Sequence, residues 1–84
     1  MSKHGAVLHR ILQGNSDAGI AFDDLCQLMR RLGFAERTRG SHHIFRFDGV
    51  DEHINLQRDG NQAKPYQVRQ VRAVILKYHL GADL

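Results

Sequence analysis

Two adjacent histidines, His42 and His43, stand at the start of a run in which polar and apolar residues alternate, residues 40–47. An imidazole changes its protonation near neutral pH, and guanidinium groups beside it can offset negative charge that develops on phosphoryl oxygens. Such a pattern is typical of acid/base chemistry on a phosphodiester. RNA would supply its own nucleophile, the 2′-hydroxyl group, so neither a covalent nucleophile nor a metal is required. The flanking arginines are Arg37, Arg39 and Arg46.

Strand alternation separates the two histidines, because successive side chains on a strand point to opposite faces. Two aromatic residues share the face of His43, which indicates that this face is turned to the core. We therefore expect His43 to be partly buried and structural. His42 is then expected on the open face, as the candidate for function. A histidine exposed on a strand can also be no more than a solvated polar residue. The two predicted faces are His43, Phe45 and Phe47, and His42, Ile44 and Arg46.

Other kinds of site find little support in the sequence. His42, His43 and His53 could bind a metal, but neighbours on a strand diverge and no carboxylate or thiol stands at ligand spacing, so we expect neither a metal nor a cofactor. A serine triad and a glycine-rich phosphate loop are not apparent. Cys26 is the only cysteine, which excludes an intramolecular disulfide, and it is interpreted as a small core residue.

Length and charge bound the remaining possibilities. With 84 residues, 42% of them apolar and 25% charged, the chain is expected to form one globular domain. A formal charge of +3 favours anionic partners, although many ordinary soluble proteins are equally basic. No apolar run has the length of a signal peptide or of a membrane span. We therefore expect a cytoplasmic protein without a membrane partner.

Hydrophobic periodicity predicts three helices and three strands. Apolar residues recur every three or four positions in the helical segments, and Gly14, Gly33 and Gly81 stand where these segments would end. Short links should join the strands into an antiparallel meander, and residues 59–63 should form a polar loop. The result is an α+β fold with helices on one face of a three-stranded sheet. The expected order is helix 3–13, helix 22–32, strand 34–39, strand 41/42–48, strand 52–58 and a helix from residue 65.

Three segments together resemble the HicA toxin family of bacterial toxin-antitoxin systems. They are residues 40–45 (GSHHIF), 54–56 (INL) and 64–68 (KPYQV), the last leading into 69–71 (RQV). The resemblance extends over residues 22–80, and its specificity comes from the order of the three segments. It implies one HicA-like domain over residues 1–84, in which residues 1–19 are an accessory helix and loop and residues 22–80 are the core.

The resemblance also implies a fold and a function. The fold would be like that of the double-stranded RNA-binding domain, α-β-β-β-α, with an extra N-terminal helix. The function would be a ribosome-independent mRNA endoribonuclease, monomeric or a small oligomer when free, that a HicB-like antitoxin neutralises by covering the active site. The family's catalytic histidine falls on His42, and its turn glycine falls on Gly40. Expected RNA contacts are Gly40, Ser41, Arg39, Arg46 and Lys64, with His43 and Arg37 as secondary candidates.

Two further hypotheses stay open. The same residues could bind phosphate and 2′-hydroxyl groups without cleaving RNA, which would make the protein a binding module. Alternatively, the open sheet face or a sheet edge could pair with a partner protein. Salt-dependent RNA binding without cleavage would favour the first, and an absence of RNA binding at low salt would favour the second.

Overall fold

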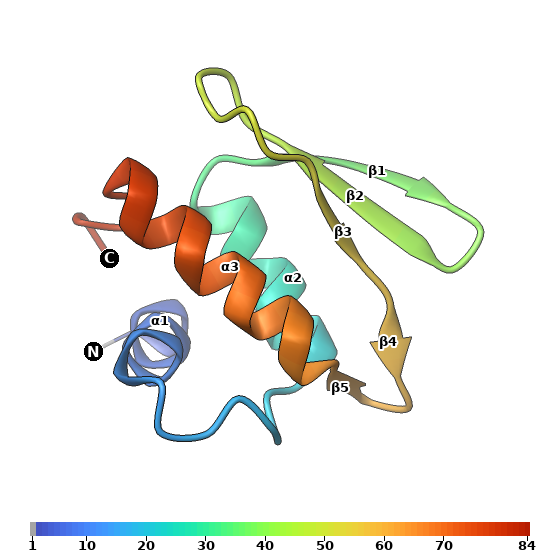
Figure 1. Ribbon diagram of the computed structural model, residues 1–84, viewed down its shortest axis with the longest axis horizontal. Helices are drawn as coiled ribbons and strands as arrows, with labels where there is room; N and C mark the ends of the chain where they lie inside the picture. Colours follow the sequence, from blue (N-terminus) through green and yellow to red (C-terminus); the bar gives the residue numbers. More distant parts are fainter. Residues whose placement is uncertain (1) are drawn as a thin grey trace.

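Three helices and two antiparallel sheets make up residues 2–84, the part of the chain that the computed structural model describes (Figure 1). The predicted α+β class and the three-stranded antiparallel sheet are confirmed. Along the chain the elements are α1 (Lys3–Gln13), α2 (Phe22–Arg31), β1 (Ala35–Arg39), β2 (His42–Arg46), β3 (Ile54–Leu56), β4 (Arg58–Asp59), β5 (Gln62–Ala63) and α3 (Pro65–Tyr78).

The main sheet has the strand order β1-β2-β3, and each neighbouring pair is antiparallel. A two-residue turn, Gly40 and Ser41, joins β1 to β2 and sets Arg39 opposite His42. Gly40 has a φ of 60°, which is the backbone that a type II′ turn requires at its first central position. Because the turn has two residues, it fixes the register of the hairpin and therefore which side chains share a face.

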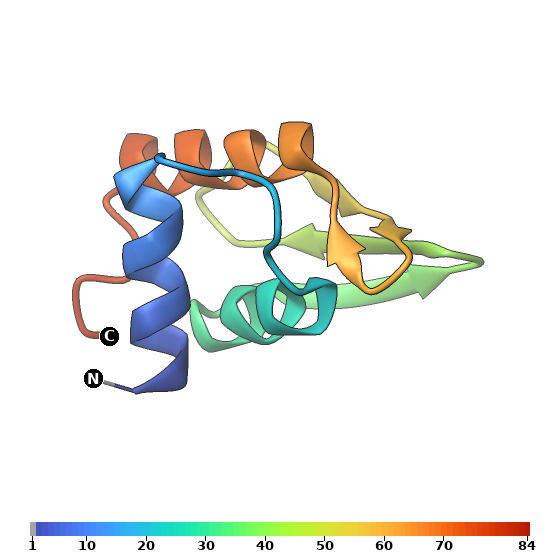
Figure 2. The same cartoon turned by 90° about the horizontal axis from the view of Figure 1, so that it is seen from below.

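The core lies between the sheet and the helices. Phe45, Ile54 and Leu56 are fully buried on the face of the sheet that α2 and α3 cover. Figure 2 shows α1 at the far end of these two helices, away from the β1–β2 turn. The helical arrangement therefore leaves the opposite face of the sheet open.

The helix ends follow local chemistry. The Ser2 hydroxyl accepts a hydrogen bond from the Gly5 N–H at 3.0 Å, which begins α1, and Gly14 ends it in the left-handed conformation. Helix α2 has two aspartates in its first turn and two arginines in its last turn, as its dipole favours. Gly33 follows with a φ of 106°, and a β-carbon there would lie 2.7 Å from the Phe47 ring. This glycine therefore both ends the helix and makes room for an aromatic side chain.

The segment after β3 differs from the sequence prediction. Residues 59–63 were expected to form a polar loop and residues 52–58 one strand, but β3 is limited to Ile54–Leu56 and a second hairpin, β4–β5, follows. Backbone hydrogen bonds attach this hairpin to the start of α2: Phe22 N–H donates to the Asn61 carbonyl at 2.9 Å, and Ala63 N–H donates to the Ile20 carbonyl at 2.8 Å. This attachment joins distant segments and leaves no local pattern, whereas the two-residue turn of the hairpin, Gly60 and Asn61, is a local signal that the prediction of a loop did not use.

The last helix also ends earlier than its glycine indicates. His79, not Gly81, adopts the left-handed conformation that ends α3, with a φ of 54°, and its N–H donates to the Ile75 carbonyl. Histidine is among the residues that visit this region more often than average. Gly81 then approaches the side chains of Leu8 and Leu32, where a β-carbon would collide with them.

Helix α1 is part of the common core. Leu8 and Ile11 are buried in the same apolar cluster as the residues of α2 and α3. The loop after α1 is fixed by Asp17, whose carboxylate accepts three hydrogen bonds of 2.9–3.0 Å from the Arg72 guanidinium. Residues 2–19 therefore enlarge the core and are bound to α3.

Within residues 2–84, no helix combines the length and the apolar composition that crossing a bilayer demands.

Candidate functional site

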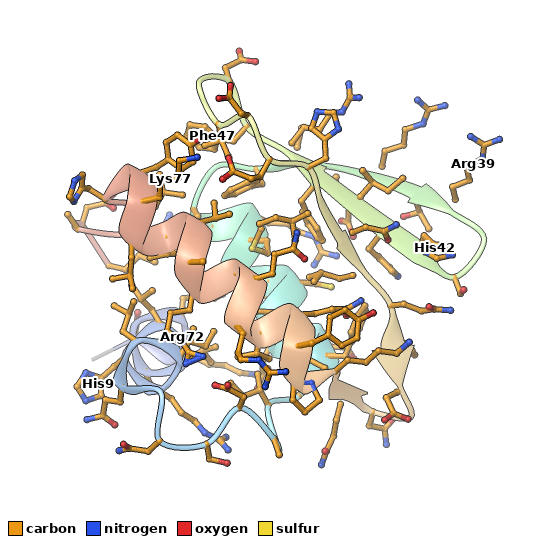
Figure 3. All side chains as sticks on the ribbon, in the orientation of Figure 1. His9, Arg39, His42, Phe47, Arg72 and Lys77 are labelled. Atoms are coloured by element: carbon orange, nitrogen blue, oxygen red, sulfur yellow. The ribbon has the colours of Figure 1, made fainter. Side chains whose placement is uncertain are left out.

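The face of the sheet turned away from the helices presents basic side chains. Arg37 lies opposite Ile44 and Arg39 lies opposite His42 in the β1–β2 register. Together with Ile44, the three arginines Arg37, Arg39 and Arg46 line a hollow of about 250 Å³. Guanidinium groups bind phosphate oxygens through paired, planar N–H donors, so this hollow suits an anionic ligand. In Figure 3, Arg39 and His42 both lie at the end of the sheet that the β1–β2 turn forms, Arg39 on the β1 side and His42 on the β2 side.

His42 is exposed on this open face, as strand alternation predicts. Its Nδ1 lies 3.1 Å from the Asn55 side-chain oxygen, Oδ1, across the β2–β3 pair. An amide oxygen can only accept a hydrogen bond, so this contact requires the proton on Nδ1. In the neutral ring, Nε2 then has the free lone pair. The contact thus presents the imidazole to the open face with one nitrogen ready to accept a proton.

The charge of the open face is not neutralised by any carboxylate of the described residues. Arg37, Arg39 and Arg46 form no ion pair within residues 2–84, and the strand positions on their face hold no acidic residue. Of the nine other lysines and arginines, six form ion pairs within residues 2–84, whereas Arg10, Arg31 and Lys64 do not. The open sheet face is therefore the place where three unpaired guanidinium groups gather on neighbouring strands. The pairs elsewhere include Lys3–Asp24, Arg30–Glu36, Arg58–Asp23, Arg72–Asp17 and Lys77–Glu52.

Lys64 is placed beyond β3 and does not line the arginine hollow. Its ammonium group donates to the Gln57 side-chain oxygen at 3.3 Å, and the Gln57 amide nitrogen donates to the Ser41 hydroxyl at 3.0 Å. Ser41 precedes His42, and Gly40 has open space around its α-carbon. Gln57 therefore connects Lys64 with the turn that positions His42.

His43 points to the opposite face, and its surroundings are structural. Its Nδ1 lies 2.8 Å from Glu36 Oε2, and its ring packs edge-on against the Phe22 ring with centroids 5.2 Å apart. Arg30 donates two hydrogen bonds to the same carboxylate, at 2.7 and 3.0 Å. The Arg30 hydrogen bonds, followed by the one from His43, hold the pKa of the Glu36 carboxyl below its usual range. The predicted inward orientation of His43 is confirmed.

Cys26, Glu36 and His43 bring three potential metal ligands within 4.8 Å of one another. The expectation that no thiol or carboxylate accompanies the histidines at ligand distance was therefore wrong, because the residues meet through packing of α2 on the sheet. The chemistry of the group nevertheless disfavours a cation. Arg30 already occupies Glu36, and burial raises the pKa of the Cys26 thiol to about 11. A protonated thiol beside a bound guanidinium fits a packed polar cluster better than a metal centre.

Two side chains of the site were not among the residues predicted for it, Asn55 and Gln57. Alternation with Ile54 and Leu56 places both on the open face, and the sequence shows this much. Their contacts with His42 and Ser41 depend on the β2–β3 register, in which His43 pairs with Leu56. No turn of fixed length joins these two strands, so the sequence leaves the register undetermined.

Comparisons of the chain with models of protein families, with curated proteins and with solved structures give no match. The fold and the site define a small α+β domain whose open sheet face presents the His42 imidazole opposite Arg39. His42 itself does not line the hollow of Arg37, Arg39 and Arg46, which form no ion pair within residues 2–84.

Proposed function

We propose that the protein is an endoribonuclease of the HicA type, which cleaves mRNA in the cytoplasm with His42 as its acid/base group. One observation supports this proposal above all others. His42 is exposed, hydrogen-bonded through Nδ1 to Asn55, and lies on the same sheet face as three arginines that form no ion pair within residues 2–84. An imidazole with a free lone pair beside unpaired guanidinium groups is suited to proton transfer at a phosphodiester.

The proposed reaction uses the 2′-hydroxyl group of RNA as nucleophile. His42 Nε2 accepts the proton of that hydroxyl, and the 2′-oxygen forms a bond to the adjacent phosphorus. The bond from phosphorus to the 5′-oxygen then breaks, and the imidazolium returns the proton to this oxygen. The products are a 2′,3′-cyclic phosphate and a 5′-hydroxyl end. Arg39 and Arg46 would stabilise the negative charge that develops on the equatorial phosphoryl oxygens in the transition state.

The order of the elements supports a fold like that of the double-stranded RNA-binding domain. Helix α2, strands β1 to β3 and helix α3 follow one another as α-β-β-β-α, with α1 and the β4–β5 hairpin as additions. The proposed substrate is single-stranded or irregular RNA, because in-line attack by the 2′-oxygen needs a backbone that a regular duplex does not offer.

The unpaired arginines of the open face also fit control by an antitoxin of the HicB type. An acidic protein surface laid over the open face would pair with Arg37, Arg39 and Arg46 and remove the imidazole from solvent. Electrostatic complementarity of this kind speeds association and selects the partner.

Cleavage by the wild type and by His42→Ala tests the proposed function. His9→Ala is the matched control, because His9 is exposed on α1, away from the β1–β2 turn (Figure 3). We expect the wild type and His9→Ala to cleave a single-stranded RNA at equal rates, and His42→Ala to lose on the order of 100-fold or more. Equal cleavage by a folded His42→Ala variant would refute the assignment.

One observation favours a second candidate, a non-catalytic RNA-binding module. His42 is the one histidine among the strand residues of the open face, so these strands supply no second imidazole as a separate general acid. If the wild type binds RNA with a salt-dependent affinity and leaves it intact, this candidate replaces the nuclease.

A further inference from the structure

We infer that Tyr66 and Lys64 form a second RNA subsite beside the His42 site, in which an unpaired base stacks on the Tyr66 ring and its phosphate contacts Lys64. The inference rests on the proposed function and specifies the substrate as RNA that is single-stranded at this point.

Tyr66 is unusual among the apolar side chains of residues 2–84. It lies in the first turn of α3, and 56% of its surface is exposed. The other exposed large apolar residues, Leu12 and Leu76, are aliphatic. An exposed aromatic ring beside a lysine is the usual platform on which single-stranded nucleic acids stack their bases.

The Tyr66 ring is held in place by Gln67, the one buried polar residue among residues 2–84. The Gln67 side-chain oxygen accepts a hydrogen bond from the Gln57 backbone N–H at 3.2 Å. Its amide nitrogen is thereby directed to the Tyr66 hydroxyl, to which it donates at 3.2 Å. A buried amide thus fixes an exposed ring, so less side-chain entropy is lost when a base stacks on it.

A chain of side-chain contacts connects this ring with the catalytic turn. Lys64 donates to Gln57, and Gln57 in turn donates to Ser41, the residue before His42. Gln57 therefore contacts both proposed subsites, through its backbone to Gln67 and through its side chain to Ser41 and Lys64. RNA that passes from the arginine hollow over His42 would next meet Lys64 and Tyr66.

The chemistry of the ring and its neighbours favours a nucleobase. Each of the four bases has a π face that can stack on tyrosine, whereas in a regular duplex these faces are hidden by the adjacent base pairs. Lys64 supplies a charge that matches the phosphate of the stacked nucleotide, and the arginines of the open face attract the neighbouring phosphates.

The test measures binding of a single-stranded RNA that contains 2-aminopurine, whose fluorescence falls when it stacks on an aromatic ring. The full-length His42→Ala protein serves as the parent, so that the RNA stays intact. Tyr66→Ala, Tyr66→Phe and Lys64→Ala are added to it one at a time. Leu76→Ala is the matched control, since Leu76 is equally exposed on α3, with 57% of its surface accessible.

We expect Tyr66→Ala to weaken binding by about 5- to 100-fold and to abolish the quenching, with the salt dependence unchanged. Tyr66→Phe should retain the quenching, and Leu76→Ala should bind like the parent. Lys64→Ala should reduce the slope of log affinity against log salt by about 0.7. When the RNA is annealed to its complement, Tyr66→Ala should leave the binding affinity unchanged.

Two different failures can be told apart. If the parent binds the RNA and Tyr66→Ala binds and quenches equally well, the Tyr66 subsite is wrong and the proposed function stands. If neither the wild type nor the parent binds RNA at low salt, the proposed function is wrong and the subsite falls with it.

Discussion

Replacing the three arginines of the open face should remove most of the electrostatic part of RNA binding. Arg37→Ala, Arg39→Ala and Arg46→Ala, combined in one variant, lower the formal charge from +3 to 0. The three side chains are exposed and form no ion pair within residues 2–84, so the free energy of unfolding should change by about 0.5 kcal/mol or less per substitution.

The size of the effect follows from counterion release. Each phosphate contact on a single strand contributes about 0.7 to the slope of log affinity against log salt, so loss of three contacts should reduce the slope by about 2. Over a fourfold rise in salt, the wild type should therefore lose roughly 15-fold more affinity than the variant. Fluorescence anisotropy of a labelled single-stranded RNA at several salt concentrations measures both slopes.

A variant of equal charge separates the local effect from the global one. Lys3→Ala, Arg31→Ala and Lys77→Ala also lower the formal charge to 0, but these residues lie on the three helices. Lys77, for example, extends from α3 in Figure 3, at the opposite end of the molecule from Arg39. This control should keep most of the salt dependence. If both triple variants lose the same slope, net charge explains binding and the open face is not the RNA interface.

Three further predictions concern single side chains. Asn55→Ala removes the hydrogen-bond acceptor that orients His42. The single-turnover cleavage rate should fall by on the order of 10- to 100-fold, while the affinity for RNA stays the same. An unchanged rate would contradict the positioning role of Asn55. Burial raises the pKa of the Cys26 thiol from its ordinary 9.0 to about 11 in the folded protein. Above pH 9 the thiol of the unfolded chain loses its proton while the folded thiol keeps it, which favours unfolding. The free energy of unfolding should therefore be unaffected by ionisation of Cys26 below pH 9 and fall by on the order of 2 kcal/mol between pH 9 and 11. Denaturant unfolding at both pH values checks this, and Cys26→Ala should lack that loss. The pKa of Glu36 is lowered from 4.5, chiefly by the Arg30 hydrogen bonds, so the stability it provides is present above pH 4.5 and lost as the pH falls through the folded value. Glu36→Gln should cost about 1 kcal/mol at neutral pH and show a smaller decline in acid, whereas an equal acid decline in both proteins would contradict the assignment.

The sequence predicts the elements whose causes are local. Helix α1 has the predicted bounds, since Ser2 and Gly14 cap it through neighbouring residues, and α2 differs by one residue at its end. The β4–β5 hairpin was missed although its two-residue turn, Gly60 and Asn61, is a local hairpin signal. Only its attachment to Ile20 and Phe22, about forty residues away, lies beyond local patterns. Periodicity also cannot show that His79 ends α3 before the available glycine.

The candidate site also combines features that local sequence predicts with contacts that depend on tertiary structure. Alternation and aromatic neighbours are sufficient to orient His42 and His43 to opposite faces, because these are properties of one strand. That Asn55 meets His42 depends on the register of β2 against β3, and the contact of Cys26 with Glu36 depends on packing of α2. Local patterns thus identify the residues of the site, and tertiary structure determines their partners.

Cleavage of two RNA substrates that differ by one oxygen atom tests the central claim most directly. The first is a single-stranded RNA that the wild type cuts at one position, and the second has a 2′-deoxynucleotide on the 5′ side of that bond. With His42 as base and the 2′-hydroxyl as nucleophile, we predict a 2′,3′-cyclic phosphate from the first substrate and no cleavage of the second at that position. His42→Ala should leave both substrates intact. Cleavage of the deoxy substrate at the same position, or cleavage of the first by folded His42→Ala, would contradict the account.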